Sequence, residues 1–576
     1  MNPDPSSGPS PRWWGRGPIR VHLCSSVVDS VWRRIALPAA AIIASAAAFA
    51  LYARVEWPWV LLGWCALVPW LAALDRVRTV GRAAVSGLLM CEAFVIAVFF
   101  WFARAISNYT GAPLAVGVLV LLLLGPLFLQ PQFLVFALVR HLARRRGAGP
   151  WRAALIGAAA YVGAEWAWPK LFADTLGHGL YASPLLRQAA DLAGAPGLTF
   201  VLVLANQLVW EALRAAIGER APPEFGRPSA RAAARAVAAP LATVAALLSA
   251  LLGYGAWRYR DLAVTAEHPP PVRAGIIQAG ISHYEQLAAK LGTYDAVRTI
   301  LDAYFALSTD LLRHRDGAPI DLLVWPETVY PTTFGSPKSE SGAEFDRAIA
   351  AFVNDVDVPL VFGSYDLDGA DEFNAAVFLE PSQDGRLGFE AYRKTSLFPL
   401  TERVPALLES AFVRRWLPWL GTWKPGDGPR VLSLRLADGR DLRVAPLICY
   451  DAVEPRLALD AVRQGAELIV TLSNDAWFAV GGGPRLHLVV SAFRSLETRR
   501  PQVRATNTGI SGIITPTGEL LGTIGVDERG TLAAAVTPRR GSPTAMVLWG
   551  DWFGPTALVA AFLLLAIGEV VRRTTR

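Results

Sequence analysis

The sequence VAPLICYD, residues 444–451, shows how the largest part of this 576-residue chain is organised. Val444 to Ile448 form an apolar run of strand length, and the run stops at Cys449. Cys449 is the only cysteine that follows Cys91, so its own domain offers it no disulfide partner. A free cysteine commonly behaves as a small buried hydrophobe, and a reactive thiol is the alternative. The residues upstream and downstream distinguish these two interpretations.

Strand-like and helix-like segments alternate on both sides of this stretch. The other predicted strands are 272–278, 321–325, 360–365, 374–380 and 467–473, and the predicted helices are 285–314, 456–464 and 486–498. Such alternation is typical of a layered α/β core. In a core of this kind, catalytic groups belong at strand ends and in the loops beyond them.

The rest of the chain is strongly apolar. A hydrophobic content of 53% and a mean hydropathy of +0.34 are too high for a soluble protein of this length. Several runs approach the ~20 apolar residues that a membrane-spanning helix needs. The predicted spans are 35–52, 57–74, 83–102, 114–139, 153–168, 197–213, 237–257 and 553–571. The first run could instead be a cleaved signal peptide, but an uncleaved span fits the charge pattern better.

The positions of the spans predict four regions. Residues 1–34, rich in Pro, Ser, Gly and Arg, are predicted to be a disordered cytoplasmic tail. A membrane domain of seven transmembrane helices is expected at 35–257, and an extracytoplasmic α/β domain at 258–550. Residues 551–576 are expected to hold the eighth transmembrane helix and a cytoplasmic end.

The net charge of +7 indicates membrane topology rather than nucleic-acid binding. Short cytoplasmic loops retain Lys and Arg, and here the basic residues fall in alternate loops. One side carries Arg33, Arg34, Arg76, Arg78, Arg82, Arg140, Arg144, Arg145, Arg146, Arg152, Arg214, Arg220, Arg227, Arg231, Arg235, Arg572, Arg573 and Arg576, whereas the other has Arg54, Arg104, Lys170 and Arg187. Both termini are therefore expected in the cytoplasm, with the α/β domain outside it.

Three chemically active residues lie at or beyond strand ends of the α/β region. Glu327 follows the strand at 321–325, Lys394 follows the strand at 374–380, and Cys449 follows VAPLI. Taken singly, Glu327 could be a surface acid and Lys394 a solvated charge. As a set they suit acyl transfer: a carboxylate can accept the thiol proton, and an ammonium can stabilise a thiolate and an oxyanion.

Several motifs resemble the nitrilase superfamily, whose signature is a Glu, Lys, Cys triad on an αββα sandwich. They are WPET (325–328), YRKTSLFP (392–399), LICYD (447–451), SNDAW (473–477) and RSLETRRPQVRATNTGISGIITPTGEL (494–520). The wider chain resembles the membrane-anchored apolipoprotein N-acyltransferases. That likeness extends through LVPWL (67–71), AEW (164–166) and LRQAADLAGAPGLTFVLVLAN (186–206).

The resemblance implies a role for each matching residue. Cys449 would be the nucleophile, Glu327 the general base, and Lys394 the cation that stabilises the tetrahedral intermediate. Glu402, in PLTERVP, matches the family's second essential glutamate, and a surface acid is the alternative. The amide of Tyr450 would donate to the oxyanion, and Asp451 stands where the family commonly has Glu.

Substrate-binding positions and departures from the family pattern follow from the same motifs. Residues implied to bind substrate are Trp325, Asn474, Trp477 and Phe478. Departures are Thr401, where the family has glycine, and Ala279 and Gly280, where it commonly has QGN with a nearby Trp. These changes lie beside the expected substrate cleft. They are therefore expected to affect which acyl donor and which acyl acceptor the protein prefers.

The implied activity is the transfer of a fatty acyl chain from a phospholipid to the α-amine of a diacylglyceryl-cysteine, by way of a cysteine thioester. No cofactor or metal is implied, and the seven histidines show no ligand spacing. The resemblance implies a monomer in the bacterial inner membrane, with the catalytic domain on the periplasmic side. The alternatives are a membrane-tethered amidase, an acyltransferase with another amine acceptor, a non-catalytic scaffold, or a lipid-binding or transport protein.

Two further segments have weaker interpretations. GGGP (481–484) is expected to be a mobile loop, because no phosphate-binding GxxxxGK accompanies it. RRWLPWLGTW (414–423) combines Trp and Arg, a composition that suits an arm resting on the membrane interface.

Overall fold

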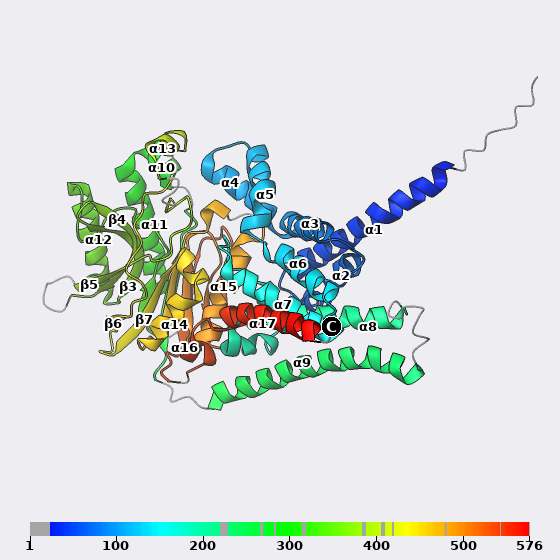
Figure 1. The fold of residues 1–576 in the computed structure, drawn as a ribbon. Helices are drawn as coiled ribbons and strands as arrows, with labels where there is room; N and C mark the ends of the chain where they lie inside the picture. The colour runs from blue at the N-terminus through cyan, green and yellow to red at the C-terminus, as the bar shows by residue number, and fades with distance from the viewer. Residues whose placement is uncertain are drawn as a thin grey trace, which may run out of the picture.

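The computed structural model describes residues 23–218, 229–264, 269–281, 284–313, 318–382, 388–404, 409–417, 420–478, 481–541 and 543–574. The chain forms two domains that lie side by side (Figure 1). A helical domain is built from residues 23–264 together with 553–574, and an α/β domain from the residues between them.

The helical domain contains long helices and short 3₁₀ turns. Its elements are α1 (Leu23–Tyr52), η1 (Trp59–Trp64), α2 (Val68–Leu74), α3 (Val80–Phe99), α4 (Trp101–Thr110), α5 (Leu114–Phe128), α6 (Gln132–Arg145), α7 (Pro150–Ala167), η2 (Leu176–Ala182), η3 (Leu186–Ala189), α8 (Ala190–Ala216), α9 (Ala230–Val264) and α17 (Phe553–Thr574).

Three helical segments among the described residues are long and apolar enough to cross a membrane. They are Val80–Phe99, Leu186–Ala216 and Ala230–Leu262, and the pair α5 and α6, bent by 44°, would make a fourth. The predicted span at 114–139 is broken because Pro131 separates α5 from α6. The predicted span at 57–74 is divided between η1 and α2, whose second residue is Pro69. The total of eight spans stays a prediction.

The N-terminal tail was expected to extend to residue 34. Residues 1–22 lie outside the described residues, and α1 begins at Leu23. The first turns of α1 therefore lie within the region that was expected to be a disordered tail. Pro38 lies inside this helix, so the apolar part Ala36–Tyr52 continues a helix that has already begun.

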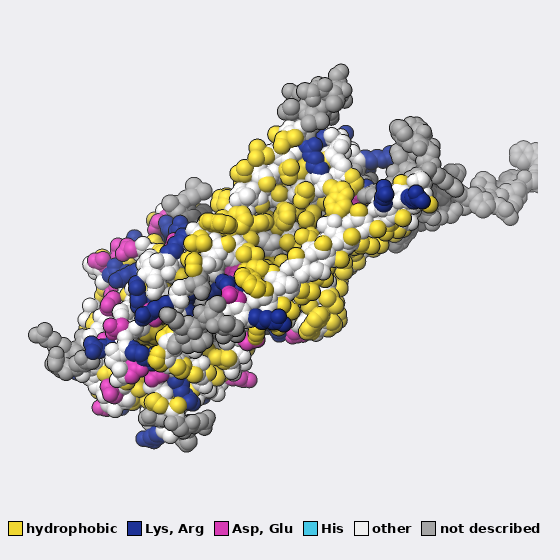
Figure 2. All heavy atoms as spheres, turned by 90° about the horizontal axis from the view of Figure 1, so that it is seen from below, with side chains coloured by type: hydrophobic (Ala, Val, Ile, Leu, Met, Phe, Trp, Pro, Cys, Tyr) yellow, Lys and Arg dark blue, Asp and Glu magenta, His cyan; other side chains and the backbone are white. Residues whose placement is uncertain are grey.

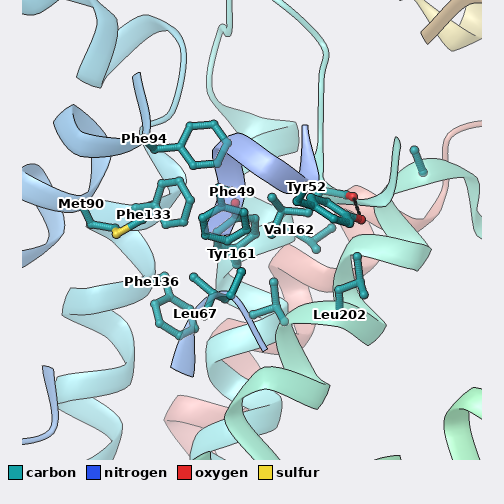
Figure 3. Packing of buried hydrophobic residues seen from close by; sticks show 14 of the residues in the cluster. Phe49, Tyr52, Leu67, Met90, Phe94, Phe133, Phe136, Tyr161, Val162 and Leu202 are labelled. Atoms are coloured by element: carbon teal, nitrogen blue, oxygen red, sulfur yellow. Dashed lines mark hydrogen bonds between the residues drawn. The ribbon is translucent and has the colours of Figure 1, made fainter. Parts of the chain in front are cut away.

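Aromatic packing holds the centre of the helical domain together. Phe49, Phe94 and Phe133 come from α1, α3 and α6, and their side chains point toward one another (Figure 3). Phe49 and Phe133 are at most 1% exposed. Close contacts between large side chains of this kind stabilise helix packing through van der Waals attraction.

The outside of the helical domain is also apolar. Figure 2 shows hydrophobic side chains over this domain, whereas charged side chains gather over the α/β domain. Leu123 on α5, Leu241 on α9 and Phe562 on α17 are 64%, 44% and 67% exposed. An apolar surface of this extent marks a membrane contact rather than a water-facing one.

The α/β domain consists of two sheets of six strands. Their orders are β12-β1-β2-β3-β4-β5 and β11-β10-β9-β8-β7-β6. β1, β2 and β3 run parallel in the first sheet, and β7, β8 and β9 run parallel in the second. The strands are β1 (Val272–Gln278), β2 (Leu322–Val324), β3 (Leu360–Asp368), β4 (Asp371–Glu380), β5 (Gly388–Arg393), β6 (Leu432–Arg435), β7 (Asp441–Ile448), β8 (Leu468–Ser473), β9 (Gln502–Thr506), β10 (Ser511–Ile514), β11 (Leu520–Ile524) and β12 (Gly530–Val536).

The sheets pack face to face, and helices cover their outer faces. Val324 and Val444 lie in the core between the sheets, whereas Leu323 packs beneath α11 and α12. Ala445 packs beneath α14. The helices are α10 (Tyr284–Leu291), α11 (Thr293–Arg313), α12 (Glu340–Val356), α13 (Ala411–Trp416), α14 (Pro455–Arg463), α15 (Gly483–Thr498) and α16 (Ala545–Trp549), with η6 (Cys449–Val453) and η7 (Ala476–Phe478). The predicted αββα sandwich is confirmed.

α15 joins the two domains. Leu488 packs on the second sheet, and Phe493 packs in the core of the helical domain. Just beyond α15, the guanidinium of Arg499 donates to Asp191 on α8 at 3.1 Å. Arg258 on α9 donates to the same carboxylate at 2.8 Å. The Arg499 pair fixes the α/β domain to α8, and the Arg258 pair fixes α9 to α8.

Candidate active site

Cys449 lies on a sharp turn at the carboxyl end of β7, where the chain enters η6. Its φ angle is +47°, in the left-handed region that side-chain-bearing residues rarely adopt. Thr328 and Leu400, beside two of the other predicted site residues, also have positive φ angles. Strained backbone gathered in one place is typical of functional sites. The Cys449 side chain is 8% exposed.

Lys394 lies between two carboxylates. Its Nζ donates to Glu327 Oε1 at 3.1 Å and to Glu402 Oε1 at 2.7 Å. Asn374 Nδ2 also donates to Glu327 Oε1, at 2.8 Å, and the amide of Asn474 donates to Glu327 Oε2 at 2.8 Å. Glu327 and Lys394 are both buried. The sequence-predicted carboxylates and ammonium therefore form one hydrogen-bonded cluster.

A glycine allows the turn that carries Glu327. A Cβ atom at Gly363 on β3 would lie 2.3 Å from Thr328 N and 2.5 Å from Glu327 Cα. No side chain fits in that space, so the backbone of β3 approaches the turn directly. Gly363 N–H then donates to Pro326 O at 3.0 Å, which fixes the turn.

The same charges act on the Cys449 thiol. Burial raises the pKa of Cys449, the Glu327 charge raises it further, and the Lys394 charge opposes both. For Lys394, burial favours the neutral amine, but Glu327 and Glu402 outweigh it and raise its pKa well above the ordinary value. The resting site thus holds a neutral thiol beside an ammonium. A thiol in this state needs a base when it attacks.

Asp451 connects the turn after β7 with the loop after β5. Its Oδ2 accepts from Ile448 N at 3.0 Å, and its Oδ1 accepts from Ser396 N at 2.6 Å and from Thr395 N at 3.2 Å. Tyr392 OH donates to Oδ2 at 3.0 Å. Burial raises the pKa of Asp451 to about 6, against the opposing effect of these hydrogen bonds. Asp451 thereby holds Cys449 of the second sheet beside the Lys394 loop of the first.

Three residues that the sequence did not point to lie behind Cys449. His487 Nε2 on α15 is 3.2 Å from the carbonyl oxygen of Cys449, and its Nδ1 is 2.9 Å from Asp475 Oδ1. Arg504 on β9 donates to Asp475 Oδ2 at 3.2 Å. Burial favours protonation of Asp475, but the charges of His487 and Arg504 outweigh it and lower its pKa to about 2. The SNDAW motif contains Asp475, and this motif was the sequence feature that could have identified the cluster.

Cys449, Asp475 and His487 could be taken for a metal site, because their ligand atoms lie within 4.8 Å of one another. The Asp475 oxygens already accept from Ser473, Arg504 and His487. A cation would have to displace the Arg504 guanidinium. Hydrogen bonding that supports the Cys449 backbone is the better assignment.

An apolar cavity, here called the thiol cavity, opens beside Cys449. Tyr450, Phe398, Trp477 and Phe478 line it. Phe398 packs edge-on against Tyr450 and Trp477, with ring centroids 5.0 and 4.9 Å apart. Trp477 and Phe478 are thus placed where a substrate could contact them. Asn474 instead contributes its main-chain hydrogen bond to Glu327.

Trp325 does not reach the thiol cavity. It is 0% exposed and packs beneath α11 and α12 with Tyr304 and Phe352. Its Nε1 donates to Ser308 at 3.0 Å. Side chains alternate between the faces of a strand, so Trp325 points to the helix layer, and it has no surface to offer a substrate.

The departures from the family pattern lie in two separate places. The carbonyl of Thr401 accepts from Tyr109 OH of α4 at 3.1 Å, so this loop touches the helical domain. Ala279 is 5% exposed, and Gly280, with φ of +68°, continues the turn after β1. Gln278 Nε2 just before them donates to Gly525 O at 2.8 Å and Glu528 O at 2.9 Å.

The two weaker predictions have different outcomes. Gly483 and Pro484 belong to the first turn of α15, so the expectation of a loop is wrong for half of GGGP. Phe412 and Trp416 on α13 are both 71% exposed, and their aromatic side chains suit a membrane interface. Trp419 of the same arm lies outside the described residues.

Comparison with known proteins identifies both domains. Residues 273–545 match the family model for carbon-nitrogen hydrolases, and residues 40–208 match that for the apolipoprotein N-acyltransferase N-terminal domain. An apolipoprotein N-acyltransferase from Bdellovibrio bacteriovorus is 26% identical over 90% of this chain and 90% of its own length. One from Geobacter metallireducens is 28% identical over 88% of this chain and 90% of its own length.

A solved structure is similar to the α/β domain. Saccharomyces cerevisiae Nit3, a member of branch 10 of the nitrilase superfamily, is 15% identical over 48% of this chain and 93% of its own, with a TM-score of 0.35.

The α/β domain is therefore of the carbon-nitrogen hydrolase, or nitrilase, class, and it follows a domain of apolar helices. This combination defines a membrane acyltransferase rather than a soluble amidase. The chain belongs to the apolipoprotein N-acyltransferase family.

Proposed function

We propose that this protein moves a fatty acyl chain from a phospholipid to the α-amine of a diacylglyceryl-cysteine at a lipoprotein N-terminus. The observation that carries the proposal is the position of Cys449. This thiol lines an apolar cavity and is near enough to Glu327, Lys394 and Glu402 for their charges to act on it. A hydrolase of small amides has no need of the apolar cavity, and a scaffold has no need of the charged cluster.

In the first half-reaction, Glu327 takes the proton of the Cys449 thiol, and the sulfur attacks the ester carbonyl carbon of the phospholipid. The Lys394 ammonium and the Tyr450 amide stabilise the oxyanion. The bond from carbon to the glycerol oxygen breaks, and Glu327 returns its proton to that oxygen. The products are a thioester on Cys449 and a lysophospholipid. A covalent intermediate of this kind divides one difficult exchange into two easier ones.

In the second half-reaction, the α-amine attacks the thioester carbonyl. Glu327 accepts a proton from the attacking nitrogen, the carbon–sulfur bond breaks, and the proton returns to the Cys449 sulfur. Glu402 holds Lys394 in place throughout, since the two are 2.7 Å apart. The apolar thiol cavity disfavours water, which would otherwise hydrolyse the thioester.

The domain boundaries and topology are part of the proposal. Residues 35–257 would form the membrane domain, 258–550 the periplasmic catalytic domain and 551–576 the last span, with both termini in the cytoplasm. The Arg-rich loops support this orientation in the bacterial inner membrane. Exposed leucines on α3, α5 and α9 support lipid contact. We propose that a single copy of the chain suffices, because every group used in the reaction comes from one chain.

The decisive experiment uses the purified full-length protein in detergent. It is incubated with phospholipid carrying a labelled acyl chain and with a synthetic diacylated lipopeptide. Triacylated lipopeptide is the expected product, and Cys449→Ala is expected to abolish it. Cys65→Ala is the matched control, because Cys65 is exposed and belongs to the helical domain.

Each arm of this experiment separates one candidate function. Labelled free fatty acid with no lipopeptide product would indicate an amidase or hydrolase. Product from Cys449→Ala equal to that from wild type would exclude a thioester mechanism. Without lipopeptide, wild type is expected to carry the label covalently, and neutral hydroxylamine should release it, since hydroxylamine cleaves thioesters.

A further inference from the structure

A second cavity lies next to the thiol cavity. It is lined by Phe49 of α1 and by Phe94, Val98 and Phe99 of α3, and we call it the helix cavity. Among the residues that the structure describes, three line both cavities: Trp101, Asp174 and Leu486. These residues form the wall that separates the space beside Cys449 from the space among the helices.

Trp101 is the largest of the three and is held from both sides. It is the first residue of α4, and its ring packs against Phe172 and Phe478 with centroids 6.0 and 6.2 Å apart. Side chains from the helical domain and from the active-site turn thus contact the same indole. Its position therefore does not depend on either domain alone.

The glycine run 481–483 packs directly against this indole. A Cβ atom at Gly481 would lie 2.7 Å from Trp101 Cβ, and one at Gly483 would lie 2.9 Å from Trp101 Cζ3. At Gly482 an added Cβ would lie 3.6 Å from Trp101 Nε1, which is ordinary van der Waals contact. Gly481 and Gly483 thus let the start of α15 lie directly against the ring.

Of the three wall residues, Trp101 controls the passage between the two cavities, because the other two have different surroundings. The Asp174 carboxylate accepts from Gln130 at 3.0 Å and lies 3.6 Å from Lys170 Nζ. One carboxylate oxygen of Asp174 is thus hydrogen-bonded within the helical domain, and the other, nearest Lys170, has no hydrogen-bond partner among the described residues. Leu486, on α15, adds an apolar side chain to the wall.

From this geometry we propose that Trp101 determines the length of acyl chain that the enzyme accepts. The inference rests on the proposed function, in which the chain is esterified to Cys449. An acyl chain that leaves Cys449 along the thiol cavity meets Trp101 at the boundary with the helix cavity. Chains that end before this wall fit, and longer chains must displace the indole.

Removal of the indole joins the two cavities into one longer channel. A phospholipid chain comes from an apolar lipid environment, so a longer chain gains close packing in the channel rather than transfer out of water. In wild type, the indole excludes the additional methylenes sterically. Trp101→Ala removes this exclusion and is therefore expected to shift the preferred chain toward greater length.

The test uses the full-length enzyme and mixed phosphatidylethanolamine donors with a graded series of saturated chain lengths, and no acceptor. Intact-protein mass spectrometry then measures which acyl chain is attached to Cys449. The variants are Trp101→Ala, Trp101→Leu and Leu486→Ala. Trp151→Ala is the matched control, because Trp151 is 41% exposed and lines neither cavity.

We expect wild type and Trp151→Ala to show the same chain-length profile, and the three wall variants to show longer chains. An unchanged profile in the wall variants, with the thioester still formed, would overturn the role of Trp101 and leave the proposed function intact. Absence of any thioester in wild type would overturn both. If Trp101→Ala does not fold, the profiles of Trp101→Leu and Leu486→Ala decide the matter in the same way.

Discussion

Replacement of Lys394 by methionine tests whether the buried cluster is an ion network. The Lys394 side chain is 2% exposed, and those of its partners Glu327 and Glu402 are 5% and 17% exposed. Removal of one partner from a buried ion pair costs about 3–5 kcal/mol, because the remaining charge is left uncompensated. In Lys394→Met, two neighbouring carboxylates would lose their shared cation. We expect the free energy of unfolding to fall by that amount near neutral pH.

The pH dependence of this loss has a definite sign. Burial favours the neutral amine of Lys394, but Glu327 and Glu402 outweigh it and raise its pKa well above the ordinary value. A raised lysine pKa gives stability that is fully present below the unfolded pKa of about 10.4 and is lost as the pH rises through the folded value. The difference between wild type and Lys394→Met should therefore be complete near neutral pH and should narrow at strongly alkaline pH.

Denaturant unfolding in detergent, followed by tryptophan fluorescence, measures this difference. Lys338→Met is the matched control, since Lys338 pairs with Glu372 and both side chains are well exposed, at 51% and 41%. Exposed pairs of this kind are worth about 0–1 kcal/mol. Thioester formation by Lys394→Met should also fall by about 10²–10³-fold, as for the loss of one oxyanion donor. A loss of stability no larger than that of Lys338→Met, or one that grows at strongly alkaline pH, would refute the reasoning.

Three further predictions concern the residues around Cys449. The carboxylate of Asp475, with its pKa lowered to about 2, stabilises the folded protein above about pH 4 and loses this contribution toward pH 2; Asp475→Asn should therefore lower Tm at neutral pH, and the two Tm values should converge in acid. His487→Ala should slow thioester formation by up to about 10²-fold, because His487 positions the Cys449 backbone; His487→Gln should recover part of the rate, and equal rates in all three proteins would exclude the role. Gly483→Ala should cost about 1–3 kcal/mol by overpacking, since its Cβ would lie 2.7 Å from Phe478. Gly388→Ala, with nothing within 4 Å of its added Cβ, should cost much less in the same denaturation assay.

The sequence predicted the parts of the fold that depend on local pattern. β1 has the predicted bounds, Val272–Gln278, because most of its residues are apolar and the strand is buried between two neighbours. The predicted helix 285–314 is divided into α10 and α11 at Gly292, whose φ is +86°. β5, β6 and β9 to β12 were not predicted, since glycine and polar residues such as Arg504 and Thr531 interrupt their apolar pattern. β12 pairs with β1, which is far away in the sequence, whereas β9 and β10 pair with each other.

The active site also contains residues that local sequence pattern predicts and residues that only the folded chain brings together. Strand ends predict that Glu327, Lys394 and Cys449 lie at one edge of the sandwich, because such ends carry functional loops. The cluster behind Cys449 could not be predicted in this way. His487 and Arg504 lie 12 and 29 residues from Asp475, on a helix and a strand that meet only in the folded protein. The prediction that Trp325 binds substrate is wrong, because a sequence motif does not show toward which face of the sheet a side chain points.

The hydrogen bonds that Glu327 and Asp451 make between the two sheets determine when the active site is completed during synthesis of the protein. Asn474 N–H of the second sheet donates to Glu327 of the first, and Asp451 binds the Lys394 loop in the opposite direction. A ribosome completes β1 to β5 before it reaches Cys449, so the base and cation are finished before the thiol exists. A chain whose second sheet has not docked has no reactive centre. Acyl transfer is therefore withheld from immature copies, and the appearance of activity during biogenesis marks the moment at which the two halves of the sandwich close.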